Sequence, residues 1–126
     1  MRFRVLPALI LALALGLAAC GEDAPTDEAA PAPDGNGHIE VDISAIDMEF
    51  VPDEITVPSG STVTFNLTND GNLEHDLMFD DGSASGVLQA GESTSFDAGP
   101  FTADTVGWCD VPGHREAGME LEVIVE

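Results

Sequence analysis

The chain has 126 residues, which is enough for one folded domain. It carries 24 acidic residues against three Lys and Arg, for a formal net charge of −21 at pH 7. A surface this acidic repels phosphate backbones, which excludes nucleic-acid binding, and its self-repulsion favours a monomer.

The first segment is typical of an export signal. Arg2 and Arg4 give a basic start, and the apolar run over residues 5–17 is shorter than the roughly 20 residues of a membrane span. The ending Leu17-Ala18-Ala19-Cys20 resembles a bacterial lipobox, in which the Cys is acylated and the chain is cut just before it. We therefore predict a signal peptide over residues 1–19 and lipidation of Cys20, the alternative being an ordinary Cys in a discarded signal.

Residues 20–37 follow as a predicted linker. The segment is rich in Pro, Ala and acidic residues and has no bulky apolar residue, so it cannot bury enough surface to fold. Pro and like charges keep such a chain extended, at roughly 3.1 Å per residue. With a lipid on Cys20, this disordered linker would tether an exported domain to the outer face of the cytoplasmic membrane or in the periplasm of a prokaryote.

Residues 38–126 form the predicted domain, and their pattern is that of short β-strands. Short strand-like segments, most of them with alternating apolar and polar residues, occur over residues 39–43, 54–57, 62–68, 75–79, 92–96, 102–109 and 120–126. Turn residues such as Pro58-Ser59-Gly60 separate these runs, and no long helix or internal repeat is indicated. The expected fold class is an all-β sandwich, with an irregular loop or a helical turn over residues 44–53.

The soft metal-donor residues of the domain lie in two places. Cys109, His114 and Met119 share one short run near the C-terminus, and His75 stands upstream. One thiolate, two imidazoles and one thioether are the donors of a mononuclear blue-copper site, with a trigonal His, His, Cys plane and a long axial Met. Once Cys20 is assigned to the anchor, Cys109 is the only thiol left, which excludes a disulfide framework.

The run between Cys109 and Met119 suits a rigid site. Pro112-Gly113 predicts a tight turn that returns His114 toward the metal, and Gly118 is expected to allow a close backbone approach. Taken singly, a His, a Cys or a Met is more often an ordinary core or surface residue than a ligand. His38 is interpreted as a non-ligand at the edge of the linker, and Met48 as a reserve candidate for the axial position.

Two segments resemble the ligand regions of the cupredoxins. The run from Cys109 to His114, ending at Gly118-Met119, resembles their ligand loop, and its C-x4-H-x4-M spacing is most similar to the rusticyanin and sulfocyanin group. The segment from Asn69 to Asp76 resembles their first ligand region, and the similarity covers roughly residues 39–126. The resemblance implies a Greek-key β-sandwich with one type 1 copper ion, its equatorial ligands being His75, Cys109 and His114 and its axial ligand Met119.

One residue departs from the family pattern. Many relatives place Asn after the first His ligand, where it helps to tie the two ligand loops together, and this chain has Asp76. A carboxylate can serve the same role as a hydrogen-bond acceptor.

The predicted function is that of a membrane-tethered electron carrier that cycles between Cu(II) and Cu(I). Its expected partners are redox proteins, such as a cytochrome or a membrane oxidase or reductase, which would exchange electrons through an apolar patch around His114. The alternative is a copper-binding or delivery protein without redox turnover. No enzyme is predicted, because multicopper enzymes need further His ligands and only His38 is left over.

The acidic composition has two interpretations. If Arg2 and Arg4 are lost with the signal peptide, Arg115 is the only basic residue of the Lys and Arg type that remains. With 24 acidic residues, the net charge is then −23. Such a charge either keeps the protein solvated in a high-salt habitat or docks a basic redox partner.

Overall fold

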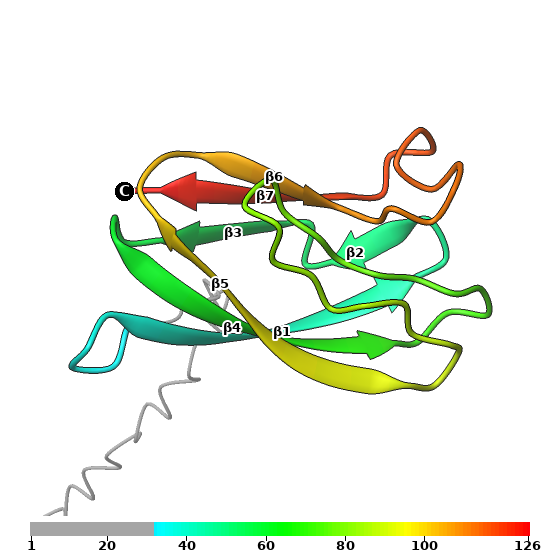
Figure 1. Cartoon of the computed structure of the whole chain (residues 1–126), viewed down its shortest axis with the longest axis horizontal. Helices are drawn as coiled ribbons and strands as arrows, with labels where there is room; N and C mark the ends of the chain where they lie inside the picture. The colour runs from blue at the N-terminus through cyan, green and yellow to red at the C-terminus, as the bar shows by residue number, and fades with distance from the viewer. Residues whose placement is uncertain (1–31) are drawn as a thin grey trace, which may run out of the picture.

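Seven β-strands make up the regular structure of the computed structural model, which describes residues 32–126 (Figure 1). The strands are β1 His38–Ile46, β2 Glu49–Val51, β3 Glu54–Val57, β4 Ser61–Asn69, β5 Ser93–Phe101, β6 Thr105–Trp108 and β7 Glu120–Val125. The predicted signal peptide and Cys20 lie outside the described residues, as does most of the predicted linker, and the division into domains stays a prediction. Within residues 32–126 the chain has no helix that is long and apolar enough to cross a membrane.

The strands form two sheets that face each other. One sheet has the order β2-β1-β4-β5 and the other has the order β3-β7-β6. β1 runs parallel to β4 and β3 runs parallel to β7, whereas the other neighbours are antiparallel. The two parallel pairs each join strands that are not consecutive in the sequence. The prediction of an all-β sandwich is confirmed.

β4 shows why these segments form strands. Val63, Phe65 and Leu67 are fully buried, while the residues between them are only partly covered. On the outer face Asn66 accepts a hydrogen bond from Ser95 Oγ at 2.7 Å and donates one to Asp42 Oδ1 at 2.9 Å. Side chains alternate along a strand, so one face of this sheet enters the core and the other carries polar pairs across strands.

The core between the sheets is built around phenylalanine rings. Phe65 stacks on Phe79 at a centroid distance of 5.2 Å and on Phe96 at 5.6 Å, and Phe79 contacts Phe101 at 5.4 Å. The facing sheet contributes Leu121 and other fully buried side chains. Burying each such side chain stabilises the fold by about 1.5–3 kcal/mol compared with leaving it exposed to water. This burial holds together the two sheets that carry the site.

Residues 44–53 were expected to be irregular, and this expectation was wrong. β1 continues to Ile46, turns through Asp47 and Met48, and pairs with β2 in the register Ile46 to Glu49. The turn is made without glycine, because Met48 itself adopts a φ of 72°. A two-residue hairpin turn normally signals itself by Asn-Gly or Asp-Gly, and that signal is missing here.

Residues 75–79 were expected to form a strand, and they form only isolated bridges. His75 pairs with Leu88, whereas Met78 pairs with Ala84 and with Trp108. The alternating apolar residues Leu77 and Phe79 do reach the core. Successive backbone groups of this segment bond to different neighbours, so no continuous ladder forms even though the side-chain pattern is that of a strand.

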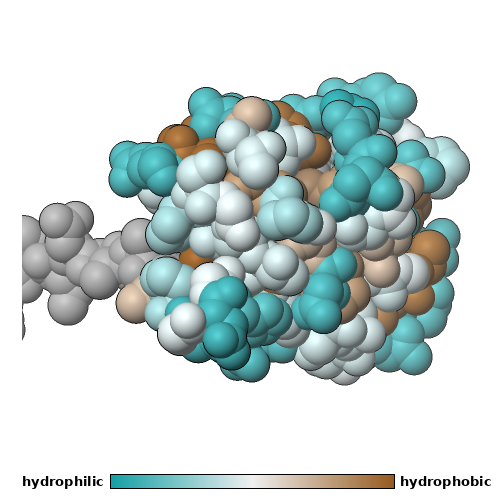
Figure 2. Space-filling view, turned by 60° about the vertical axis from the view of Figure 1, so that its left-hand side comes forward, coloured by the Kyte–Doolittle hydropathy of each residue, from teal (hydrophilic) through white to brown (hydrophobic). Residues whose placement is uncertain are grey.

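The surface of the domain is largely hydrophilic. Figure 2 shows hydrophilic side chains spread over one face of the molecule, with small hydrophobic areas between them. Four large apolar side chains are exposed among the described residues: Ile46, Val51, Leu73 and Val87.

Candidate metal centre

Three of the four predicted donors meet at the end of the sandwich where the loop between β6 and β7 lies (Figure 1). The Nδ1 atoms of His75 and His114 are 3.2 Å apart. Cys109 Sγ lies 3.5 Å from Nδ1 of His114 and 3.9 Å from Nδ1 of His75. His75 and Cys109 are fully buried, and His114 keeps 7% of its surface exposed.

The size of this triangle fits a small metal ion. The point equidistant from atoms separated by 3.2, 3.5 and 3.9 Å lies about 2.1 Å from each of them, within the range of about 2.0–2.3 Å for imidazole and thiolate bonds to a d-block ion. Among residues 32–126 no other group of His, Cys, Asp and Glu side chains is arranged to hold an ion. The donor set of two imidazoles, one thiolate and one thioether is that of a type 1 copper centre.

A tight turn brings His114 back toward Cys109. Cys109 follows directly after β6, and the His114 N–H donates to the carbonyl of Val111 at 3.0 Å. Pro112 and Gly113 occupy the two central positions, and Gly113 has a φ of 85°. A positive φ at the second central position after Pro is the geometry of a type II turn. This is the turn that Pro112-Gly113 predicts.

The backbone of Met119 links the two other loop donors. Its N–H donates to the carbonyl of His114 at 3.1 Å, and its carbonyl accepts from the N–H of Cys109 at 3.1 Å. The residue is fully buried. Gly118 was expected to serve a close backbone approach, but a Cβ built there would meet nothing within 4 Å. Its φ of 100° is the reason for glycine, because side chains rarely adopt that conformation.

Asp76 joins the two ligand segments. Its Oδ1 accepts a hydrogen bond from the Asp110 N–H at 2.6 Å, so the carboxylate serves as the predicted acceptor. Burial, the largest cause, raises the pKa of the Cys109 thiol, and the negative charge of Asp76 acts in the same direction. A cation bound by Cys109 would favour the thiolate, because a coordinating thiol is deprotonated.

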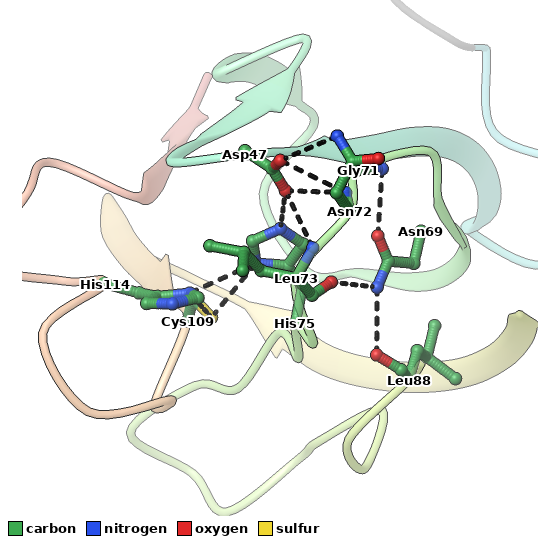
Figure 3. A network of polar contacts seen from close by, with 9 residues as sticks. All are labelled: Asp47, Asn69, Gly71, Asn72, Leu73, His75, Leu88, Cys109 and His114. Carbon is green, nitrogen blue, oxygen red and sulfur yellow. Dashed lines mark hydrogen bonds and ion pairs between the residues drawn. The ribbon is translucent and has the colours of Figure 1, made fainter. Parts of the chain in front are cut away.

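Asn69, at the end of β4, shapes the loop that carries His75 (Figure 3). Its fully buried amide donates to the carbonyls of Leu73 at 2.8 Å and Leu88 at 2.9 Å, and its Oδ1 accepts from the Gly71 N–H at 3.0 Å. The amide nitrogen and the oxygen of this buried side chain are therefore both hydrogen-bonded, and these bonds hold the backbone of the loop before His75 in place.

Asp47 contacts the other side of the His75 ring. Its Oδ1 lies 3.1 Å from Nε2 of His75 and 3.1 Å from the backbone nitrogen of Leu73. The Leu73 N–H, followed by the His75 side chain, lowers the pKa of Asp47 to about 2. Sequence reasoning missed this residue, because it lies 28 positions before His75 on another strand pair and nothing in the pattern connects them.

His38 and Met48, the two residues weighed beside these donors, lie on other elements than the donors. His38 Nε2 is 2.8 Å from the hydroxyl oxygen of Thr64, which accounts for its ring without a metal. Met48 occupies the β1–β2 turn. The guanidinium of Arg115, a residue of the loop between β6 and β7, lies over the Trp108 ring at 4.2 Å from its centre.

Comparison with known proteins gives a match to a family of sequences and matches to solved structures. A model of the cupredoxin-like domain family matches residues 8–105, which is most of the chain but ends before Cys109. No curated protein sequence matches the chain at a significant level.

The solved structures share the fold at low identity. Auracyanin A, a "blue" copper protein from the green thermophilic photosynthetic bacterium Chloroflexus aurantiacus, is 18% identical over 71% of this chain and 99% of its own, with a TM-score of 0.62. Dithionite-reduced auracyanin from Roseiflexus castenholzii is 20% identical over 69% of this chain and 96% of its own, with a TM-score of 0.58.

A multicopper oxidase is 16% identical over 76% of this chain, with a TM-score of 0.62, and only 45% of that oxidase is covered. These likenesses concern the β-sandwich, whereas the family match rests on the sequence itself. On that match, this chain belongs to the family of cupredoxin-like domains.

Proposed function

We propose that this protein is a one-electron carrier with a single type 1 copper ion, held by His75, Cys109 and His114 with Met119 as the axial ligand. The triangle of donor atoms supports this most directly, because its dimensions fit one ion and its chemistry is soft. Copper bound there would supply the Cu(II)/Cu(I) couple.

The surrounding residues suit electron transfer because they hold the donors in place. The loop is held by the turn at Pro112-Gly113, by the two backbone bonds of Met119 and by the acceptor Asp76. A loop held in this way suits a site that must change little between Cu(II) and Cu(I). His114 is the least buried of the three triangle donors. Its ring edge is the proposed place where electrons enter and leave, and the apolar residues Pro112 and Ala117 of the same loop are exposed.

The burial of the donors argues against a delivery role. A delivery protein passes its ion on by ligand exchange, which needs donors that a partner can reach. Cys109 and Met119 are fully buried here. One metal group among the described residues also argues against multicopper catalysis, although a multicopper oxidase shares the fold.

The optical and paramagnetic resonance spectra of the copper-loaded protein test this function. We expect an intense visible thiolate-to-copper band, a small copper hyperfine splitting and reversible one-electron reduction. The Cys109→Ser variant is the control and should bind copper without the intense band. Normal copper spectra in the unaltered protein, or a colourless copper(I) protein that resists oxidation, would contradict the proposal.

We also propose that the carrier is exported and anchored by a lipid on Cys20. The lipobox-like ending at Cys20 and the Pro- and acid-rich segment after it support this. Expression in a bacterium should place the protein in the membrane fraction with the mass of an acylated Cys20. Release into the soluble fraction by Cys20→Ser is the expected result, and an unchanged distribution would refute the anchor.

A further inference from the structure

The two nitrogens of the His75 ring face different partners. Nδ1 points to Cys109 and His114, at 3.9 and 3.2 Å, and Nε2 points to Asp47 at 3.1 Å (Figure 3). The carboxylate of Asp47 is one-third exposed, whereas His75 is fully buried. The ring is therefore clamped between the other two donors, Cys109 and His114, on one side and the single carboxylate of Asp47 on the other.

This clamp selects one tautomer of the ring. A carboxylate has no hydrogen to donate, so the contact requires the hydrogen to be on Nε2. The lone pair is then on Nδ1, the atom that faces the other donors. An imidazole can bind a metal only through an unprotonated nitrogen, and the hydrogen bond at the opposite nitrogen decides which one that is.

Asp47 is itself held in this orientation by the loop before His75. Its two oxygens accept from the backbone N–H of Asn72 at 2.9 and 3.1 Å and from the Asn72 amide at 3.2 Å, and Oδ1 also accepts from Leu73. At Gly71 an added Cβ would collide with Oδ1 of Asp47 and would lie 3.0 Å from Nε2 of His75. The loop thus leaves room for the carboxylate and directs donors at it.

The turn that presents Asp47 is strained. Met48 adopts a φ of 72° in the two-residue connection between β1 and β2. Such a conformation costs about 1–3 kcal/mol for a residue with a side chain and persists only where the surroundings determine it. The surroundings here are the bonds of Asp47 to the His75 loop.

We propose that Asp47 is a positioning residue for His75, which fixes Nδ1 as the donor nitrogen and places a negative charge next to the site that favours the oxidised state. The charge half of this inference rests on the proposed function, whereas the tautomer half does not. A negative charge near a redox centre stabilises its more positive state, so it lowers the reduction potential.

Three variants separate the hydrogen bond from the charge. Asp47→Asn removes the charge but keeps an oxygen toward His75, because the N–H groups of Asn72 and Leu73 still require an acceptor there. Asp47→Ala removes both. Glu49→Gln removes one charge from an exposed side chain at the start of β2, two residues away, and is the matched control.

Nitrogen-15 NMR of the histidine rings in the metal-free full chain tests the tautomer. We expect hydrogen on Nε2 of His75 in the unaltered protein, in Asp47→Asn and in Glu49→Gln, and a mixture of tautomers in Asp47→Ala. If Asp47→Ala does not fold, Gly71→Ala serves instead, because its Cβ displaces the carboxylate that remains in the chain. Hydrogen on Nδ1 in the unaltered protein would overturn the inference.

The reduction potential of the copper-loaded protein tests the charge. Asp47→Asn should raise the potential clearly more than Glu49→Gln, and Asp47→Ala should also lose about 10- to 100-fold in Cu(II) affinity. Equal potentials in Asp47→Asn and Glu49→Gln would overturn the charge effect. If no blue band forms in any variant, the proposed function fails, while the NMR result still decides whether Asp47 positions His75.

Discussion

Two acidic residues lie beside the donor triangle and serve different purposes. Asp47 accepts from the far nitrogen of His75, and Asp76 accepts from the backbone of Asp110, next to Cys109. Bringing a cation into a buried place is costly unless charges or dipoles of opposite sign are already there. Asp47 and Asp76 are placed to offset that cost.

Asp76 gives a direct test at the scale of one residue. Asp76→Ala should lower the free energy of unfolding of the metal-free protein by about 1–3 kcal/mol, because it leaves the Asp110 N–H without its acceptor. Asp76→Asn keeps an acceptor oxygen and should lose much less. Urea unfolding of both variants measures the difference, and equal losses would show that charge rather than the hydrogen bond is what matters.

At the scale of elements, the loop between β6 and β7 depends on backbone shape as well as on its donors. Gly113 has a φ of 85° in the turn that places His114, and Gly91, outside the ligand loop, has a φ of 83°. Neither has any atom within 4 Å of a built Cβ. The two glycines are therefore matched in strain and in space but differ in their relation to the site.

This match yields a prediction with an internal control. Gly113→Ala and Gly91→Ala should each destabilise the metal-free protein by about 1–2 kcal/mol, which is the cost of a left-handed conformation with a side chain. Only Gly113→Ala should also weaken copper binding, because the same turn carries His114. Urea unfolding and competitive copper titration measure the two effects. A comparable loss of affinity in Gly91→Ala would show that general stability controls the site.

The ligand loop was predictable from sequence, and the support of His75 was not. Pro112-Gly113 between Cys109 and His114 is a local signal, because turn geometry and ligand spacing lie within a few residues. Asp47 reaches His75 only through the pairing of β1 with β4, which sets the start of the His75 loop beside the β1–β2 turn. Contacts of this kind depend on the register between strands, and a single sequence does not carry that information.

Two of the predictions about strands, for residues 75–79 and for residues 44–53, failed for a related reason. Side-chain alternation at Leu77 and Phe79 correctly indicates burial, yet it does not show whether backbone partners exist on both sides. In residues 44–53 the hairpin turn contains Met48 where a glycine or asparagine would be the usual signal. Periodicity therefore predicted which faces are buried better than it predicted where ladders begin and end.

At the scale of the whole molecule, negative charge is almost uncompensated. Arg115 is the only Lys or Arg after residue 4, and it is engaged locally, with its guanidinium over Trp108 and its Nε 2.9 Å from Glu120 Oε1. Among the described residues, this contact with Glu120 is the only ion pair between a carboxylate and a Lys or Arg. The other acidic residues of the strands and turns thus repel one another without a Lys or Arg beside them, and this repulsion opposes the compact state.

Added salt should therefore stabilise the fold. The screening length falls from about 30 Å at 0.01 M to about 10 Å at 0.1 M and about 3 Å at 1 M, so most of the gain should come at low concentration and then level off. The urea midpoint of the metal-free protein, measured in sodium chloride and in choline chloride, should rise equally in both salts. A midpoint that keeps rising linearly beyond this range, or that differs between the cations, would indicate specific ion binding instead. A midpoint that does not rise at all would mean that the acidic groups are too well hydrated for their repulsion to affect stability.

Because screening acts on the surface charges and leaves the buried triangle of His75, Cys109 and His114 unchanged, the visible spectrum of the copper-loaded protein should stay constant over the same range of salt.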